Sequence, residues 1–304
     1  MPRSAAVPTI LVTGSNGQVG FELRRSFAPL GNVTALDRAG CDLSCPDMLR
    51  RVVRQYRPDV IVNSGAYTAV DKAETEADLA FAVNGTAPGI LAEEAKALGS
   101  LLVHYSTDYV FDGTKDGPYF ESDVVNPQSV YGKSKLTGEQ AVLASGANAL
   151  VLRTCWVAGQ HGGNFAKTML RLGRERNVLR VIVDQVGAPT TAALVADVTA
   201  QIVARYWLTA PRSAFPSGIY HLAAAGETSW HGYATEVLRY AVALGVELKV
   251  DPAGIEAIPA TAYPLPAPRP SNSRLDTSKL RDTFGIYLPD WRDGVHHLLD
   301  QILT

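Results

Sequence analysis

The sequence predicts an α/β protein built around a doubly wound parallel sheet. Short apolar runs alternate with longer segments of helical apolar spacing through about the first 160 residues, and a glycine-rich turn follows the first apolar run. Alternation of this kind is typical of right-handed β-α-β units. A hydrophobic content of 46% in 304 residues is sufficient for a substantial core.

Five apolar runs have the length and composition of strands that are buried on both faces. They are short, continuous and rich in β-branched residues, and they cover residues 9–14, 33–37, 59–65, 101–107 and 149–154. Segments with apolar residues on one helical face lie between them and predict helices over 18–30, 46–56, 77–99 and 134–144.

The pattern becomes less regular after about residue 160. Helices are expected over 164–176 and 194–207, with a strand over 178–184 between them. We therefore expect a nucleotide-binding domain over residues 1–163, rejoined by part of 178–210, and a smaller, less regular α/β substrate domain formed mainly by 164–304. The proline-rich segment 258–276 is either a linker or a binding loop, and periodicity does not choose between the two.

Charge and cysteine content exclude several classes of protein. The net charge of -2 gives no basic excess for nucleic acid or an anionic membrane, and no apolar run approaches the roughly 20 residues of a membrane span. The first eight residues lack the pattern of a signal peptide. Three cysteines without a second Cys/His pair argue against a disulfide framework and a zinc site. A cytoplasmic location is expected.

The turn after the first strand contains three glycines spaced G-x-x-G-x-x-G, namely Gly14, Gly17 and Gly20. Gly14 permits a tight turn, Gly17 lets the backbone approach a pyrophosphate, and Gly20 permits close helix-strand packing. The N–H groups of Gly17, Gln18 and Val19 would then face phosphate at a helix N-terminus. The position of this turn indicates a Rossmann-type dinucleotide site.

The second strand ends in a charged pair about 20 residues further along the chain. Asp37 is suited to a ribose 2′-hydroxyl, which favours NAD, whereas Arg38 is suited to a 2′-phosphate, which favours NADP. Both residues are present, so the choice between NADH and NADPH stays open. Asp42 is a candidate for a contact on the adenine side.

Tyr131 and Lys135 lie four residues apart in a predicted helix, so they share one helix face. A cation beside a phenol favours the phenolate, and such a tyrosine can serve as a general acid or base. Thr107 ends a predicted strand upstream, at the sheet edge where α/β proteins bind ligands. The glycine turn, Thr107 and the Tyr/Lys pair together are far more specific than any one of them.

The strings "VTGSNGQVG", "STDYVF" and "YGKSK" resemble the extended short-chain dehydrogenases/reductases. The longer strings "NSGAYTAVDKAE", "VLRTCWVAG", "DQVGAPT" and "YPLPAPRPSNSRLDTSKL" extend this resemblance over almost the whole chain, to the branch of the family that reduces dTDP-4-dehydro-L-rhamnose. The resemblance implies the last step of dTDP-L-rhamnose synthesis for polysaccharides. A hydride would pass from NADPH, or alternatively from NADH, to C4 of the keto-sugar.

The resemblance also implies roles for individual residues. Tyr131 would supply the proton, Lys135 would hold the nicotinamide ribose, and Thr107 would contact the reacting oxygen. The implied cofactor-binding residues are Gly14, Gly17, Gln18, Val19, Asp37, Arg38, Asp42, Leu43, Ala66, Tyr67, Thr68, Tyr105, Tyr131 and Lys135. The implied substrate-binding residues are Val70, Thr107, Asp108, Tyr109, Trp156 and Arg269, the last near the diphosphate.

Two departures from the family pattern concern a metal. Some relatives bind Mg2+ across a dimer contact through carboxylates. Glu22 is present here, but Ala193 and Arg292 occupy positions where such relatives have acids. We therefore assign no metal ligands, regard Mg2+ as a possible but doubtful component, and expect a monomer or a weak homodimer.

Two alternative functions remain open. One is another 4-keto sugar-nucleotide reductase or an epimerase of the same fold, which pocket residues would distinguish. The other is a non-catalytic relative that binds cofactor and regulates a partner enzyme. The presence of Thr107, Tyr131 and Lys135 together favours catalysis.

Overall fold

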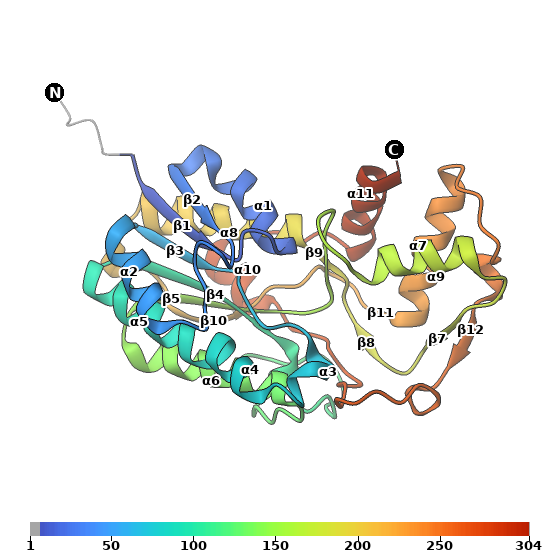
Figure 1. Cartoon of the computed structure of the whole chain (residues 1–304). Coiled ribbons are helices and arrows are strands. Elements are labelled where there is room, and N and C mark those ends of the chain that lie inside the picture. The colour runs from blue at the N-terminus through green and yellow to red at the C-terminus, as the bar shows by residue number, and fades with distance from the viewer. Residues whose placement is uncertain (1–6, 304) are drawn as a thin grey trace.

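The computed structural model describes residues 7–303 and contains a six-stranded parallel sheet (Figure 1). Each neighbouring pair of strands is parallel, and the strand order is β10-β5-β4-β3-β1-β2. This order confirms the predicted fold class. The strands are β1 (Thr9–Thr13), β2 (Asn32–Leu36), β3 (Val60–Asn63), β4 (Leu101–Thr107), β5 (Asn148–Thr154) and β10 (Gly218–His221).

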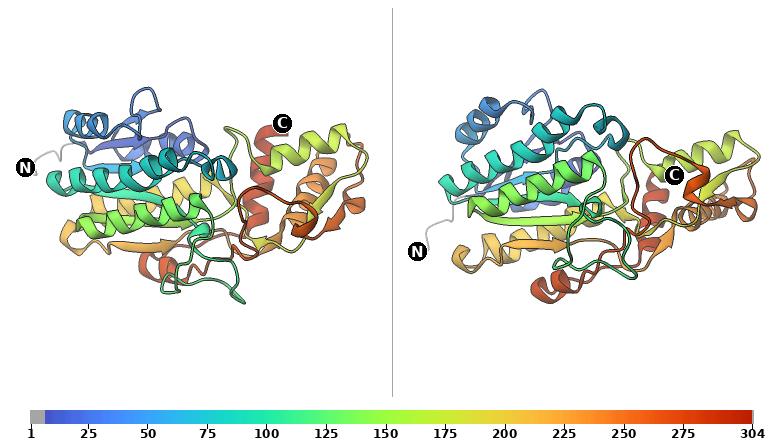
Figure 2. Two further views of the ribbon diagram at one scale, coloured as in Figure 1. Left: turned by 60° about the horizontal axis from the view of Figure 1, so that its bottom comes forward. Right: turned by 90° about the horizontal axis from the view of Figure 1, so that it is seen from below.

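Side chains of alternate residues in these strands pack into two separate apolar layers, one on each face of the sheet. In β1, Ile10 and Val12 pack into the layer beneath α1 and α8, whereas Leu11 points into the layer beneath α2 and α5. Figure 2 shows the helices of the second layer running side by side. Burial on both faces explains why the strands are continuous apolar runs. The covering helices are α1 (Gln18–Phe27), α8 (Ala192–Val203) and α10 (Ser278–Phe284) on one face, and α2 (Pro46–Tyr56), α5 (Ala87–Leu98) and α6 (Val130–Ser145) on the other.

The edge strand β10 was not anticipated from the sequence. The expected strand over 178–184 forms as β7 (Arg180–Ile182), but it pairs with β12 (Glu256–Ile258) away from the main sheet. The expected helix over 194–207 forms as α8 and packs against α1. The short run at 218–221 has little local signal, and its pairing with β5 depends on tertiary contacts. The division into domains at residue 163 stays a prediction.

A smaller group of elements packs beside the carboxyl edge of the sheet. Three helices share one apolar cluster that includes Trp291, Tyr233 and Leu238. Two pairs of two-residue strands accompany these helices. The elements are α7 (Phe165–Glu175), α9 (Trp230–Ala243) and α11 (Trp291–Leu303), with the pairs β6 (Val157–Ala158) and β9 (Thr190–Thr191), and β8 (Val186–Gly187) and β11 (Thr228–Ser229).

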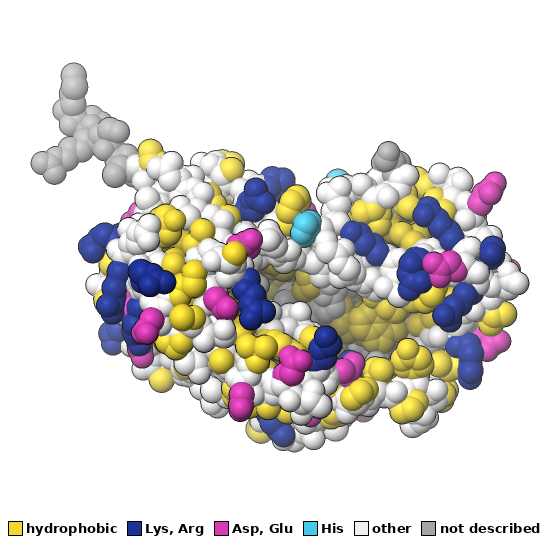
Figure 3. All heavy atoms as spheres, in the orientation of Figure 1, with side chains coloured by type: hydrophobic (Ala, Val, Ile, Leu, Met, Phe, Trp, Pro, Cys, Tyr) yellow, Lys and Arg dark blue, Asp and Glu magenta, His cyan; other side chains and the backbone are white. Residues whose placement is uncertain are grey.

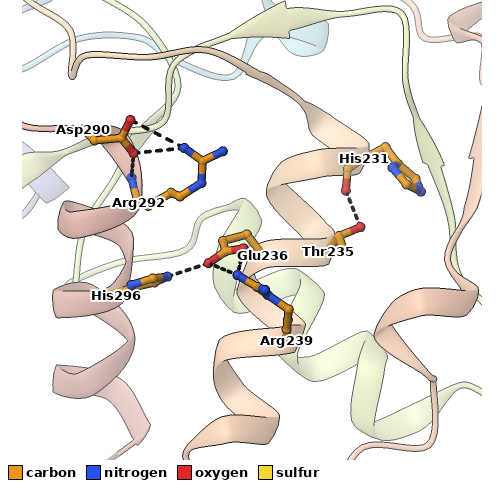
Figure 4. A network of polar contacts seen from close by, with 7 residues as sticks. All are labelled: His231, Thr235, Glu236, Arg239, Asp290, Arg292 and His296. Atoms are coloured by element: carbon orange, nitrogen blue, oxygen red, sulfur yellow. Dashed lines mark hydrogen bonds and ion pairs between the residues drawn. The ribbon is translucent and has the colours of Figure 1, made fainter.

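A polar cluster connects α9 to α11 in this smaller group (Figure 4). The Glu236 carboxylate accepts from His296 Nε2 at 2.7 Å and from Arg239 Nη2 at 2.9 Å. The Tyr240 ring stacks on His296 with centroids 4.0 Å apart. His296 thus contributes to helix packing, while the neighbouring His297 is exposed. Arg292 is exposed and pairs with Asp290.

The segment between β3 and α5 contains α3 (Val70–Ala73), α4 (Ala77–Phe81) and a π-helical turn (Ala82–Thr86). The predicted helix over 77–99 is therefore interrupted by this turn. Within residues 7–303, no helix combines the length and apolar character needed to cross a membrane.

Candidate active site

A cavity of about 820 Å³ lies at the carboxyl ends of the sheet strands. Figure 3 shows the hollow between the larger part of the molecule, on the left, and the smaller part, on the right. Its lining contains every sequence-predicted site residue except Arg269, namely Gly14, Gly17, Gln18, Val19, Asp37, Arg38, Asp42, Leu43, Ala66, Tyr67, Thr68, Val70, Tyr105, Thr107, Asp108, Tyr109, Tyr131, Lys135 and Trp156. Their roles stay predictions, but the fold brings them together.

Two of the three glycines in this turn, Gly14 and Gly20, are packed too tightly for a side chain. Gly14 has φ +70°, and a Cβ there would lie 2.5 Å from the backbone of Gly65. A Cβ on Gly20 would lie 2.1 Å from the Gly14 carbonyl oxygen. Gly17 directly precedes α1 as its N-cap residue, and no side chain caps this helix end. The turn therefore leaves a bare helix N-terminus facing the cavity, as an anion site requires.

One expectation for this turn is wrong. The Gly17 N–H donates to the Gly14 carbonyl at 2.9 Å, so it is not free for a phosphate. The side chain of Gln18 is also engaged: its Oε1 accepts from the Gly159 N–H at 2.8 Å and from Asn164 Nδ2 at 3.0 Å. Gln18 thereby joins α1 to the segment that leads into α7. Of the three predicted phosphate donors, the backbone N–H groups of Gln18 and Val19 lie in the uncapped first turn of α1.

The charged pair after β2 lies at one end of the cavity. Asp37 accepts from Asn16 Nδ2 and from the Gly40 N–H, both at 3.1 Å. Arg38 is exposed, with its Nε 3.4 Å from Asp42 Oδ2. A fixed carboxylate and an extended guanidinium therefore stand side by side, and the geometry accommodates either a 2′-hydroxyl or a 2′-phosphate.

Tyr131 and Lys135 lie on α6 and face β4, whose last residue is Thr107. The Ser129 hydroxyl caps α6 by accepting from the Gly132 N–H at 3.1 Å, which fixes the start of this helix. Lys135 Nζ donates to the Tyr105 carbonyl at 2.5 Å. The helix end and the strand end therefore hold the hydroxyl, the phenol and the ammonium group at one wall of the cavity.

Electrostatics at this wall differ from the sequence-based expectation. Burial raises the pKa of Tyr131 to about 12, and the nearby Thr107 hydroxyl offsets only part of this rise. Burial lowers the pKa of Lys135 to about 8. The expected lowering of the phenol's pKa is therefore wrong, because burial raises this pKa and the Lys135 ammonium group is directed at the Tyr105 carbonyl. Tyr131 is a protonated phenol at neutral pH.

Asp108 is a buried carboxyl group beside these residues, 3% exposed. Its Oδ1 accepts from the Thr107 hydroxyl at 3.0 Å, while its Oδ2 has no hydrogen-bond partner in the described part of the chain. Burial raises the pKa of Asp108 to about 6, although hydrogen bonds from the Ser273 and Thr107 hydroxyls lower it in part. An unpaired acceptor in a cavity wall is costly for folding and is suited to a ligand hydroxyl.

Two tryptophans form another part of the wall. Trp156 has a positive φ of 47°, an uncommon conformation for a non-glycine residue. Its ring stacks on Trp230 with centroids 3.7 Å apart and planes at 15°, and a Cβ on Gly187 would lie 2.7 Å from it. Trp230 also lines the cavity but was not predicted from the sequence. Trp230 lies far from Trp156 in the sequence, so only the fold brings the two rings together.

Arg269 lies in the proline-rich segment and outside the cavity lining. Its Nη2 contacts Asp71 Oδ2 at 2.8 Å, while its Nη1 is buried without a hydrogen-bond partner among the described residues. Asp71 Oδ1 accepts from the Ala267 N–H at 3.1 Å, and the Ser271 hydroxyl donates to the Gly113 carbonyl at 2.7 Å. The segment is thus a strap attached at several points to the larger part of the molecule.

Asn84 supports the segment of Ala66, Tyr67 and Thr68. Its Oδ1 accepts from the Tyr67 N–H at 2.8 Å, and its Nδ2 donates to the Tyr67 carbonyl at 2.9 Å and the Ser134 hydroxyl at 3.0 Å. Asn84 belongs to the π-helical turn and is 1% exposed. It therefore fixes the cavity-lining loop relative to α6, a role that the sequence pattern did not reveal.

Glu22 was considered as a metal ligand because some relatives use a carboxylate there. It pairs with Arg25 at 3.1 Å. Within residues 7–303, no group of three or more His, Cys, Asp or Glu side chains is arranged to hold a metal ion. Cys41 and Cys155 are buried, and Cys45 is exposed; all three are free thiols.

Comparison with known proteins decides the family. The model of the RmlD substrate binding domain matches residues 8–304. The dTDP-4-dehydrorhamnose reductase of Burkholderia thailandensis is 50% identical over 97% of this chain and 99% of its own length. The chain belongs to the dTDP-4-dehydrorhamnose reductase family. The family member of Escherichia coli K12 is 47% identical over 97% of this chain and 98% of its own length.

Solved structures of the family have the same fold over nearly the whole chain. The Bacillus anthracis dTDP-4-dehydrorhamnose reductase in complex with NADP matches with a TM-score of 0.88, 31% identity and coverage of 97% of this chain and 99% of that chain. The Clostridium acetobutylicum reductase matches with a TM-score of 0.88, 34% identity and coverage of 97% and 100%.

Proposed function

We propose that this chain reduces the 4-keto group of dTDP-4-dehydro-L-rhamnose to give dTDP-L-rhamnose, with NADPH or NADH as reductant. The observation that carries this proposal is the convergence of Thr107, Tyr131 and Lys135 in the cavity that begins at the glycine turn. Relatives at 50% and 47% identity are named for this reaction, and the Bacillus anthracis relative is described in complex with NADP.

The residues present fit a dinucleotide. The cradle between Gly14 and Gly20 would be filled by any Cβ, and the uncapped end of α1 faces the cavity. Gln18 and Val19 would hold the pyrophosphate through backbone N–H groups, and Lys135 would hold the nicotinamide ribose. A bound nicotinamide cofactor supplies the hydride. Both Asp37 and Arg38 line the adenosine end, which supports use of NADPH, NADH or both.

The chain's own residues account for the proton and the developing charge. Tyr131, with a pKa of about 12, carries a proton at neutral pH and can donate it to an alkoxide oxygen. The Thr107 hydroxyl lies beside it and would supply a second donor to the same oxygen by turning its proton away from Asp108 Oδ1. Lys135 provides positive charge in a buried environment, where electrostatic interactions are strong.

Two cavity residues, and Arg269 of the neighbouring strap, fit a nucleotide-linked deoxysugar. The unpaired Oδ2 of Asp108 is an acceptor for a sugar hydroxyl. The Trp156 ring offers a flat apolar surface for a sugar face. The unpaired Nη1 of Arg269 is available to the diphosphate, while Asp71 holds the other side of this guanidinium. These three contacts are proposals, as is the assignment of residues 164–304 mainly to substrate binding.

A coupled assay tests this function. The keto-sugar is generated in situ, and oxidation of NADPH and of NADH is followed at 340 nm. The Tyr131→Phe variant should retain NADPH affinity and lose turnover by about 10²–10⁴-fold, as expected for removal of a general acid. Tyr220→Phe, outside the cavity, is the control and should match the parent. Near-normal turnover by Tyr131→Phe would contradict the role of Tyr131.

Failure of the parent protein to oxidise either nucleotide would favour a different 4-keto sugar-nucleotide substrate, an epimerase or a non-catalytic role. The expected monomer or weak homodimer and the cytoplasmic location stay proposals, to be tested by light scattering and by cell fractionation. We expect the activity not to require Mg2+, so a chelator should leave it unchanged.

A further inference from the structure

A buried ion pair lies directly behind the Tyr/Lys wall. Glu139 follows Lys135 on α6 by four residues, as Lys135 follows Tyr131, so the three side chains share one face of the helix. Glu139 Oε1 accepts from Arg153 Nε at 2.9 Å, and its Oε2 accepts from Arg153 Nη2 at 2.6 Å. Glu139 is 0% exposed and Arg153 is 2% exposed. This bidentate geometry is that of a strong ionised pair.

The arginine of this pair is itself fixed by the sheet. Arg153 lies on β5 opposite Ser106 of β4, and its guanidinium lies 5.0 Å from the centre of the Phe111 ring. Burial and the charge of Arg153 lower the pKa of His221 to about 3, so this neighbour is neutral. Arg153 therefore has Glu139 as its charged partner, and the pair joins α6 to β5.

The groups that face Lys135 from β4 carry no charge. Its ammonium group donates to the Tyr105 carbonyl at 2.5 Å and lies 3.5 Å from His104 Nε2. Burial lowers the pKa of His104 well below its usual value, so the imidazole is neutral. Tyr131, one turn earlier on α6, is a protonated phenol. Burial disfavours the charged form of Lys135, and the negative charge of Glu139 opposes this effect.

We propose that Glu139 is a positioning residue for the reductase, which keeps the buried Lys135 charged for cofactor binding and is itself held in place by Arg153. This inference rests on the proposed function only in taking Lys135 as the lysine that contacts the cofactor. A pair with no electrostatic role could be exchanged for apolar residues of similar size without affecting Lys135. That difference makes the proposal testable.

The experiment measures NADPH affinity by titration calorimetry, without sugar, between pH 6 and pH 10. In the parent protein, affinity should fall above about pH 8, where Lys135 loses its proton. In Glu139→Gln the fall should begin about one pH unit lower, because the opposing negative charge is absent. Glu139→Asp keeps that charge and should keep the parent profile. The control is Glu94→Gln, which removes a buried carboxylate on α5 that pairs with Arg50 and Arg54 of α2.

A double variant, Glu139→Leu with Arg153→Met, removes the pair without leaving an unpaired buried charge, so it decides the matter if Glu139→Gln does not fold. In the double variant, as in Glu139→Gln, NADPH affinity should begin to fall at a lower pH than in the parent. A folded Glu139→Gln or double variant with the parent pH profile would overturn it, even if stability had changed. A parent that binds NADPH with this pH dependence but reduces no sugar would refute the proposed function alone.

Discussion

Asp108→Asn tests whether the ionised carboxylate of Asp108, buried in the cavity wall, lowers the free energy of unfolding. In the native protein burial raises the pKa of Asp108 to about 6, against an ordinary value of 3.8. The native state therefore binds more protons than the unfolded state between about pH 4 and pH 6, and stability decreases as the pH rises through this range. A pKa difference of about 2 corresponds to about 3 kcal/mol at pH 7.

Asparagine has a similar shape and no charge, so it avoids this penalty. Asp108→Asn should be about 3 kcal/mol more stable at pH 7 to 8, and this gain should vanish below about pH 4. For a chain of this size the gain corresponds to a rise in Tm of about 5 °C. The variant should also have a KM for the sugar nucleotide raised about tenfold or more, because a charged acceptor is lost from the cavity.

Thermal unfolding from pH 4 to pH 8 provides the assay, with Asp112→Asn as a control of opposite sign. Hydrogen bonds from Thr114, Tyr119 and Asn126 help to lower the pKa of Asp112 to about 2. Its carboxylate therefore stabilises the native state above the ordinary pKa, and Asp112→Asn should lower Tm at pH 7. An Asp108→Asn protein with a Tm equal to or below that of the parent at pH 8 would refute the reasoning.

Three further predictions concern the turn, the strap and the aromatic wall. Gly20→Ala places a Cβ 2.1 Å from a backbone oxygen, so the protein should lose about 1–3 kcal/mol of stability and bind NADPH more weakly. Gly254→Ala, outside the cavity lining and with its nearest contact at 3.7 Å, should leave both Tm and affinity unchanged. Arg269→Gln should raise the KM for the sugar nucleotide about tenfold with kcat retained, whereas the exposed Arg292→Gln should not; an unchanged KM would return the strap to a structural role. Trp230→Ala should raise the same KM, because it removes the ring that stacks on Trp156 and fixes it. Equal KM values for parent and variant would contradict this role of Trp230.

The regular half of the fold was predictable because its signals are local. Strands buried on both faces appear as continuous apolar runs, so β4 was expected over the residues where it forms. The glycine turn was equally visible, because its tight geometry requires glycine at Gly14 and Gly20. Resemblance to a known family then contributed the grouping of the remaining cavity residues.

What the sequence did not reveal depends on contacts between distant segments. The edge strand β10 contains only four residues and is specified by pairing with β5. The bonding of the Gly17 N–H within its own turn and the direction of the Lys135 ammonium group are set by the packed backbone. The stack of Trp156 on Trp230 joins residues 74 positions apart. Such contacts cannot be predicted from the spacing of residues along the chain.

The stacked tryptophans also give the protein an optical reporter. The chain has four tryptophans; Trp156 and Trp230 stack in the cavity wall, whereas Trp207 and Trp291 are each 1% exposed in two separate apolar cores. Indole emission should therefore divide into a component sensitive to ligand and a constant background. A sugar nucleotide that settles against Trp156 would change the first without altering the second. Occupancy of the cavity could thus be followed in the unlabelled protein, with no attached dye and no turnover.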